Sequence, residues 1–81
     1  MYMRLDKFLK VSRIIKRRTI ANEAADNGRI SVNDKVAKAS YDVKVGDIIE
    51  IRFGDKVSKY KILKIVEHPG KDMGNLVEEL K

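Results

Sequence analysis

The spacing of the hydrophobic residues changes at Gly28, and this change constrains the fold of the 81-residue chain more than any other feature. Before Gly28 the apolar residues recur every three to four positions, which is typical of helices with one buried side. After Gly28 they alternate with polar residues, which is typical of half-buried strands. Helices followed by strands predict an α+β domain, in which two N-terminal helices pack on a small, mostly antiparallel, twisted sheet.

The part before Gly28 predicts two short helices. The first begins at about Arg4 and places Leu5, Phe8, Leu9 and Ser12 on one stripe. The second covers residues 17–27 and ends at Gly28, because glycine readily adopts the left-handed conformation that closes a helix. Its helical spacing comes from Ile20, Ala21, Ala24 and Ala25.

The part after Gly28 predicts strands joined by tight turns. Ile30, Val32 and Val36 alternate with polar residues, and Asn33-Asp34 is expected to turn because both residue types tolerate positive φ. Residues 38–44 form a connection and Gly46-Asp47 a turn in this interpretation. The longer strands are Ile48–Phe53, with Ile49, Ile51 and Phe53 on one face, and residues 57–66, separated by Gly54-Asp55.

The last residues predict a short third helix. Met73, Leu76, Val77 and Leu80 fall at positions i, i+3, i+4 and i+7, the spacing of one helix face. We expect this stripe to pack on its own domain, since few residues are available to stabilise the helix alone.

Length and composition predict one domain, residues 1–81, held together by packing. A chain this short buries roughly 60–65% of the surface that its unfolded form exposes, so the core is thin. The sequence has no cysteine, which excludes disulfides and cysteine-ligated metals. It has no apolar run of membrane-spanning length and no apolar N-terminal signal. We therefore expect a cytoplasmic protein that does not enter a membrane.

The positive charge is concentrated in residues 4–18, called the basic segment below. The segment has seven Lys or Arg residues and one acid, a balance of +6, which equals the net charge of the whole chain. A basic run is usually only a solvated face. Here, however, Lys16, Arg17 and Arg18 stand at the start of the second helix, where cations oppose the helix dipole. An anion such as phosphate would relieve this repulsion.

The residues do not predict an enzyme. The sequence has no Walker loop, no metal-ligand spacing and no Ser/His/Asp or Cys/His set, so we expect no cofactor and no metal. Asp6 is expected to pair with a neighbouring cation such as Lys10 or Arg13, or to cap its helix. His68, beside Pro69-Gly70, is expected to be an exposed turn residue. Phe8, the one aromatic residue of the basic segment, is expected to be buried, which argues against base stacking on exposed rings.

Several short motifs in order resemble the S-four RNA-binding domain, named for small-subunit ribosomal protein four. They cover residues 4–53 and include Asp6 to Leu9, Arg17-Arg18-Thr19, Gly28-Arg29, Val32-Asn33 and Gly46-Asp47. The stretch 3–13 and Arg52-Phe53-Gly54 further resemble the RqcP-like proteins, a stand-alone bacterial branch that is related to a heat-shock protein of about fifteen kilodaltons. The resemblance implies a basic two-helix unit, the alpha-L motif, that reads folded RNA by shape and phosphate.

The resemblance also implies a function and partners. RqcP-like proteins bind obstructed large ribosomal subunits that carry peptidyl-tRNA, and they act with an RqcH-type tailing factor that adds alanine to the stalled chain. We therefore expect large-subunit ribosomal RNA, peptidyl-tRNA and that factor as partners, and a monomer away from the ribosome. In the family the region of Arg4 and Arg18 faces a ribosomal RNA stem and the P-site tRNA. With Lys10 added from the cationic helix face, the candidate RNA-binding residues are Arg4, Asp6, Lys7, Lys10, Arg13, Lys16, Arg17 and Arg18.

Two other functions remain open at this point. Two short basic helices are also typical of a DNA-binding helix-turn-helix module. The second helix carries Asn22, Glu23, Asp26 and Asn27, however, a surface poorly suited to the major groove. The other alternative is a general recycling factor for large subunits, like the heat-shock relative, which would not need the tailing factor.

Overall fold

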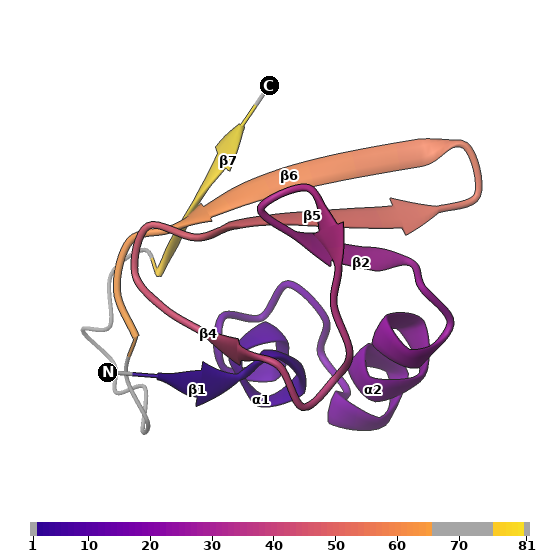
Figure 1. Ribbon diagram of the computed structural model, residues 1–81, viewed down its shortest axis with the longest axis horizontal. Helices are drawn as coiled ribbons and strands as arrows, with labels where there is room; N and C mark the ends of the chain where they lie inside the picture. Colours follow the sequence, from indigo (N-terminus) through magenta and orange to yellow (C-terminus); the bar gives the residue numbers. More distant parts are fainter. Residues whose placement is uncertain (1, 66–75, 81) are drawn as a thin grey trace.

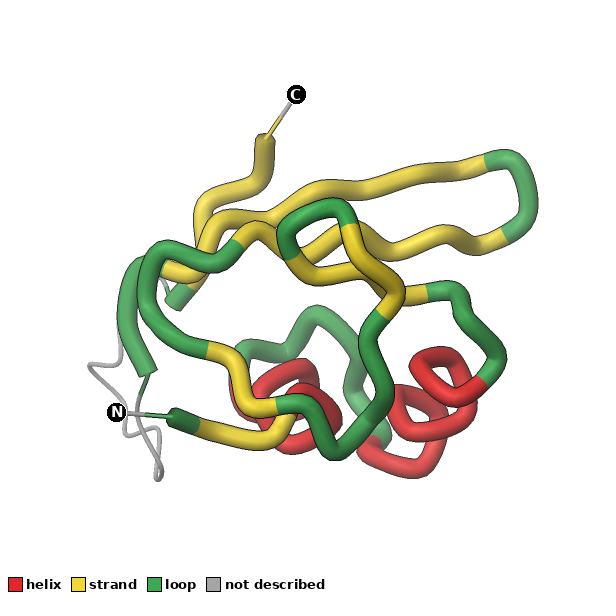
Figure 2. The backbone as a smooth tube through the Cα atoms, viewed as in Figure 1, coloured by secondary structure: helices red, strands yellow, loops and turns green. Residues whose placement is uncertain are grey.

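The computed structural model describes residues 2–65 and 76–80, which form a helical layer beneath a twisted antiparallel sheet (Figures 1 and 2). Helix α1 covers Leu5–Val11 and helix α2 covers Arg18–Asp26, and the two helices pack against each other. The expected α+β fold is therefore confirmed. None of the helices in this part of the chain is long and apolar enough to cross a bilayer.

The main sheet has five strands in the order β3-β2-β5-β6-β7, and every neighbouring pair is antiparallel. The central strand β5 occupies Ile48–Phe53, the bounds expected from the sequence. The other strands are β2 (Ile30–Val32), β3 (Lys35–Val36), β6 (Lys56–Ile62) and β7 (Val77–Leu80). The hairpin of β5 and β6 extends beyond the helices at one end of the molecule (Figure 1).

The core lies between the helices and the sheet. From α1 it receives Leu5, Phe8 and Leu9, all fully buried, so Phe8 is buried as expected. Helix α2 contributes three alanines, Ala21, Ala24 and Ala25. Because an alanine side chain is a single methyl group, α2 can lie close to the rest of the core, but its alanines add little apolar area to it. The sheet completes the core with Ile30, Val32, Ile49, Ile51 and Ile62.

Helix α2 ends at Gly28 as expected. Gly28 has a φ of 75°, its N–H donates to the carbonyl of Ala25, and the Arg29 N–H donates to the carbonyl of Ala24. These two bonds form the Schellman motif, which satisfies carbonyls that the helix itself leaves without partners. The chain then turns directly into β2, which brings Arg29 beside the end of α2.

Asn33 joins the first turn of the sheet to the last turn before β5. Asn33 and Asp34 have φ values of 53° and 68° and form the two-residue hairpin between β2 and β3, as expected. The Asn33 side chain donates to Asp47 Oδ1 at 3.0 Å and accepts the Ile48 N–H at 3.0 Å. Asp47 is itself buried and accepts the Lys44 N–H. Asn33 and Asp47, two motif residues fourteen positions apart, thus connect the two turns by hydrogen bonds.

The expected C-terminal helix is wrong where the structure describes it. Val77–Leu80 is strand β7, which pairs with β6 so that Val77 lies opposite Ile62 and Leu80 opposite Lys59. The exposed edge of β6 offers a row of backbone partners, whereas an isolated helix of two turns gains little. Leu76 is buried, as both interpretations require. Met73 of the expected stripe and the expected turn at His68 lie outside the described residues.

Two further boundaries differ from expectation. The connection at residues 38–44 contains strand β4 (Asp42–Val43), which pairs with β1 (Met3–Arg4) in a separate two-stranded sheet. These two-residue strands are too short to produce an alternating pattern in the sequence. Strand β6 ends at Ile62 rather than at residue 66, after the Ile62 N–H has bonded to the Asp47 carbonyl.

Three apolar side chains that the patterns assigned to buried stripes are instead exposed. Ile20 is 44% exposed, Phe53 is 44% exposed and Val36 is 67% exposed. Ile20 lies beside the alanine stripe of α2, and Phe53, at the end of β5, lies across an open groove from that helix. Ser12 likewise lies beyond the first stripe, because α1 ends at Val11.

Candidate nucleic-acid interface

The carboxylate of Asp6 is the centre of the candidate interface. Asp6 lies in the first turn of α1, and only 2% of the residue is exposed. Arg4, at the N-cap position of α1, donates from Nε to Oδ1 and from Nη2 to Oδ2, both at 3.3 Å. Arg18, the first residue of α2, places Nε 3.3 Å from Oδ2 and donates from Nη2 to Oδ1 at 3.5 Å. One buried acid thus holds two arginines, each by a two-pronged contact.

Two more donors complete the surroundings of this carboxylate. The Lys7 backbone N–H donates to Oδ1 at 2.8 Å, and Asn22 Nδ2 donates to Oδ2 at 3.3 Å. Asn22 lies one helical turn after Arg18, so α2 contributes two side chains to the same acid. A buried charge is tolerated when it is paired and hydrogen-bonded in this way. We call Asp6, Arg4, Arg18 and Asn22 the Asp6 cluster.

The Asp6 cluster keeps its acid ionised. Burial acts to raise the pKa of the Asp6 carboxyl, because the charged form loses its hydration. Hydrogen bonds from Asn22, Arg18 and the Lys7 N–H, together with the positive charge of Arg18, outweigh burial and hold that pKa below its ordinary value. The acid is therefore negative at neutral pH and can orient both guanidinium groups.

The two arginines still face solvent. Their side chains are 49% exposed at Arg4 and 45% exposed at Arg18. A guanidinium has five N–H donors, and the contacts to Asp6 use two of them in each arginine. The remaining donors are available to an anion. A shallow hollow lined by Asp6, Arg18, Thr19, Asn22 and Glu23 lies at the same place.

Within the described residues, the start of α2 has no side-chain cap and no acid beside it. Its N-cap residue is Arg17, which makes no side-chain capping bond, and the first turn contains no acid. Lys16 and Arg17 are exposed beside it. Free N–H groups at a helix start and exposed cations both favour an anion. The expectation of crowded positive charge at this helix start is confirmed.

The other cations of the basic segment do not form one helix face. Lys7 is half-buried and Lys10 exposed on α1, but Arg13 lies beyond the end of that helix with a φ of 65°. The expected cationic face of α1 thus does not include Arg13, because the helix ends at Val11. Among residues 2–65 and 76–80, no ion pair or hydrogen bond involves the side chains of Lys7, Lys10, Arg13, Lys16 or Arg17.

Asp6 pairs with cations, as expected, but not with the ones that the sequence suggested. The acid pairs with Arg4 and Arg18, not with Lys10 or Arg13, and Arg4 rather than Asp6 occupies the N-cap of α1. The pairing with Arg18 spans twelve positions and depends on how α1 and α2 pack, which local spacing cannot show. Asn22 was missed for the same reason. The described residues contain no group of three or more possible metal ligands.

Comparison with known proteins identifies the family. Residues 3–49 match the S4 domain model, and this range contains the whole Asp6 cluster. The chain is 59% identical over 70 residues to the RQC P-site tRNA stabilizing factor of Streptococcus pneumoniae. These residues cover 86% of this chain and 80% of the relative. Its counterpart in Bacillus subtilis is 56% identical over 70 residues, with coverage of 86% and 81%.

A more distant relative is the heat shock protein 15 homolog of Haemophilus influenzae, which is 35% identical over 63 residues, 78% of this chain and 48% of the relative. The trimeric structure of heat shock protein 15 from Vibrio cholerae has a TM-score of 0.85 at 29% identity and covers 99% of this chain and 83% of that one. The chain thus belongs to the S4 domain family and, within it, to the RQC P-site tRNA stabilizing factors.

Proposed function

We propose that this protein binds RNA on obstructed large ribosomal subunits, without catalysing a reaction, and supports the alanine tailing of stalled chains. The observation that carries the proposal is the Asp6 cluster, in which one buried acid aims two half-exposed arginines outward from adjoining helix starts. Helical RNA is recognised largely through phosphate and 2′-hydroxyl groups. A rigid pair of guanidinium forks suits these groups, because each fork can bind a phosphate with two parallel hydrogen bonds.

The ligands of the site are large-subunit ribosomal RNA and peptidyl-tRNA. The most similar named relatives above are P-site tRNA stabilizing factors by name, which supports tRNA as one of the two. Arg4, Lys7, Lys10, Arg13, Lys16, Arg17 and Arg18 contact RNA in this proposal. Asp6 belongs to the site as the residue that positions Arg4 and Arg18, since its buried carboxylate repels phosphate and binds the arginines. The protein acts in the cytoplasm, as a monomer off the ribosome, with an RqcH-type tailing factor.

Sedimentation with purified large subunits carrying peptidyl-tRNA tests the RNA-binding site. Changing four cations of the basic segment, Arg13, Lys16, Arg17 and Arg18, to glutamate should abolish co-sedimentation. A matched control changes four exposed lysines of the sheet and the segment after it, Lys56, Lys59, Lys61 and Lys64, to glutamate. This control has the same net charge but leaves the interface intact. Equal loss in both variants would mean that only net charge matters and would refute the assignment of the site.

The tailing role needs a separate test in cells. Deletion of the gene should remove alanine tails from stalled chains, and the native protein should restore them. The heat-shock relationship supports a second function, the recycling of large subunits without tailing. Tails that persist unchanged in the deletion strain would favour recycling over tailing. Tighter binding to duplex DNA than to ribosomal RNA at matched salt would instead favour the helix-turn-helix alternative.

A further inference from the structure

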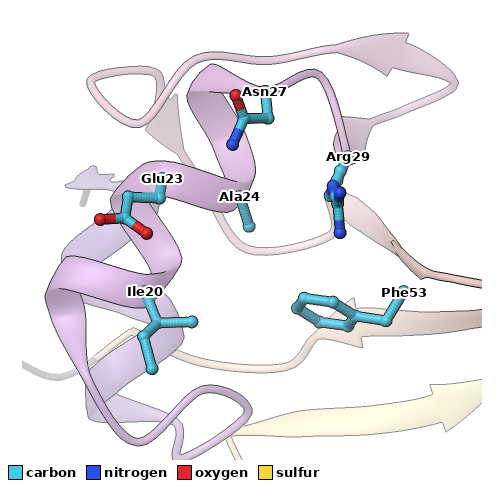
Figure 3. A pocket seen from close by; sticks show the side chains of 6 residues that line it. All are labelled: Ile20, Glu23, Ala24, Asn27, Arg29 and Phe53. Carbon is cyan, nitrogen blue, oxygen red and sulfur yellow. The ribbon is translucent and has the colours of Figure 1, made fainter.

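A groove beside the Asp6 cluster contains an exposed aromatic ring. It lies between α2 and the end of β5 and has a volume of about 280 Å³. Figure 3 shows the Phe53 ring directed toward Ile20 across the groove, with Glu23 and Asn27 along the helix side. Ala24 and Arg29 complete the lining. The spacing of residues in the sequence could not predict this groove, because Ile20 and Phe53 are thirty-three positions apart.

The walls and floor of the groove suit a flat ligand. Ile20 and Phe53 are each 44% exposed, so both side chains present apolar surface to the groove. Ala24 forms a shallow floor because it lies between Ile20 and Asn27 on the same face of α2 and has only a methyl group. Pockets that enclose whole small molecules have volumes of about 300–1,000 Å³. At about 280 Å³ this groove lies just below that range, so a ligand of the size of one base suits it better than a larger molecule.

The position of the groove relates it to RNA. Glu23 lines both this groove and the hollow at the Asp6 cluster, so the two adjoin along α2. Arg29 adds a cation at the sheet side of the groove. A strand whose phosphates bind near Arg18 would therefore have its next bases beside Phe53. Proteins that recognise unpaired bases combine such cations with aromatic rings on which the bases stack.

We propose that this groove binds one unpaired base of the RNA. The base stacks on a face of the Phe53 ring, and Ile20 borders the base across the groove. Stacking on an aromatic side chain needs only the flat face of a base, so it does not require a particular base. This inference rests on the proposed RNA-binding function and adds base recognition to it.

The test uses a short RNA stem with a single unpaired guanine and the same stem without it, titrated with the full chain at fixed salt. The unpaired guanine should raise the affinity of the native protein. Phe53→Ala should remove this gain, a loss of about 5- to 150-fold, because stacking contributes about 1–3 kcal/mol per base. Phe53→Tyr should keep the gain, since it preserves the ring.

Controls separate this inference from the proposed function. Val57 is 53% exposed on the same hairpin but does not line the groove. Val57→Ala should therefore leave the affinity for both RNA stems unchanged. Charge reversal in the basic segment should weaken binding to both stems; if it does not, the proposed function fails. Thermal melting first establishes that Phe53→Ala is folded. The base site is refuted if this variant still binds the stem with the unpaired guanine more tightly, or if the native protein does not. If Phe53→Ala lost tailing in cells but still bound both RNA stems as the native protein does, the groove would bind a protein, and the base site would also be refuted.

Discussion

Arg18 Nε lies 3.3 Å from Asp6 Oδ2, so the first residue of α2 is fixed to the first turn of α1. Arg4 makes the equivalent contact from the other end of the carboxylate. The acid therefore has two effects. It joins the two helices, and it holds two cations in a fixed outward orientation. Preorganised side chains lose less conformational entropy on binding than freely rotating ones.

Asp6→Asn should separate these effects from simple loss of charge. The amide has the same shape but cannot accept two arginine forks, so the free energy of unfolding should fall by about 1–3 kcal/mol. RNA affinity should also fall, although the net charge rises by one. Chemical denaturation and RNA titration measure the two results. Stronger RNA binding by the variant would show that net charge, and not the orientation of the arginines, controls the interaction.

The lowered pKa of Asp6 predicts a specific acid sensitivity. In the folded protein this carboxyl stays charged at pH values where it is already protonated in the unfolded chain, whose pKa is near the ordinary 3.8. The stabilisation is thus complete above the unfolded pKa and disappears as the pH falls through the lower folded pKa. Urea denaturation from pH 6 down to pH 2 should show a steeper loss of stability in the native protein than in Asp6→Asn. Parallel pH profiles would contradict this prediction.

Arg18→Ala should weaken binding to the large subunit much more than Arg52→Ala. Arg18 is half-exposed at the proposed interface, whereas Arg52, on the central strand, is 66% exposed and pairs with Glu50. Each lost phosphate contact should also reduce the slope of log affinity against log salt by about 0.7–0.9. With about five contacts to RNA, the native slope should be near −3.5 on the single-strand scale. Equal slopes for the native protein and Arg18→Ala would exclude a phosphate contact at this residue.

Asn33→Gly should destabilise the sheet without affecting RNA contacts. Glycine accepts the positive φ of this position, so the variant isolates the loss of the side-chain bonds to Asp47 and to the Ile48 N–H. The free energy of unfolding should fall by about 1–3 kcal/mol, because buried Asp47 loses a donor. Asn33→Ala should cost about 1–2 kcal/mol more through left-handed strain. RNA affinity at a temperature where the variants remain folded should match that of the native protein.

Leu9→Ala tests the core under the interface. Leu9 is fully buried in α1, and its truncation should lower the free energy of unfolding by about 2–4 kcal/mol through lost burial and a cavity. For a domain this small, that loss is a large part of the total stability. Lys10→Ala, at the exposed neighbouring position, provides the control and should leave the melting temperature almost unchanged. Similar melting temperatures for the two variants would place the core elsewhere.

The sequence predicted features whose cause is local. The two helices, the stop at Gly28, the turn at Asn33-Asp34 and the strand Ile48–Phe53 all follow from spacing or from residue conformation within a few positions. The concentration of positive charge in the basic segment is likewise a property of the sequence. These features were sufficient for the fold class and for the family.

Tertiary structure alone decided which of these residues meet. Asp6 finds Arg18 and Asn22 only because α1 and α2 pack with their starts together, and Ile20 faces Phe53 only because the β5–β6 hairpin extends past α2. Val77–Leu80 becomes a strand because β6 offers it an edge, although its own spacing also fits a helix. Periodicity records which face of an element is apolar. It contains no information on the partner that covers that face, since this partner is supplied by another part of the chain.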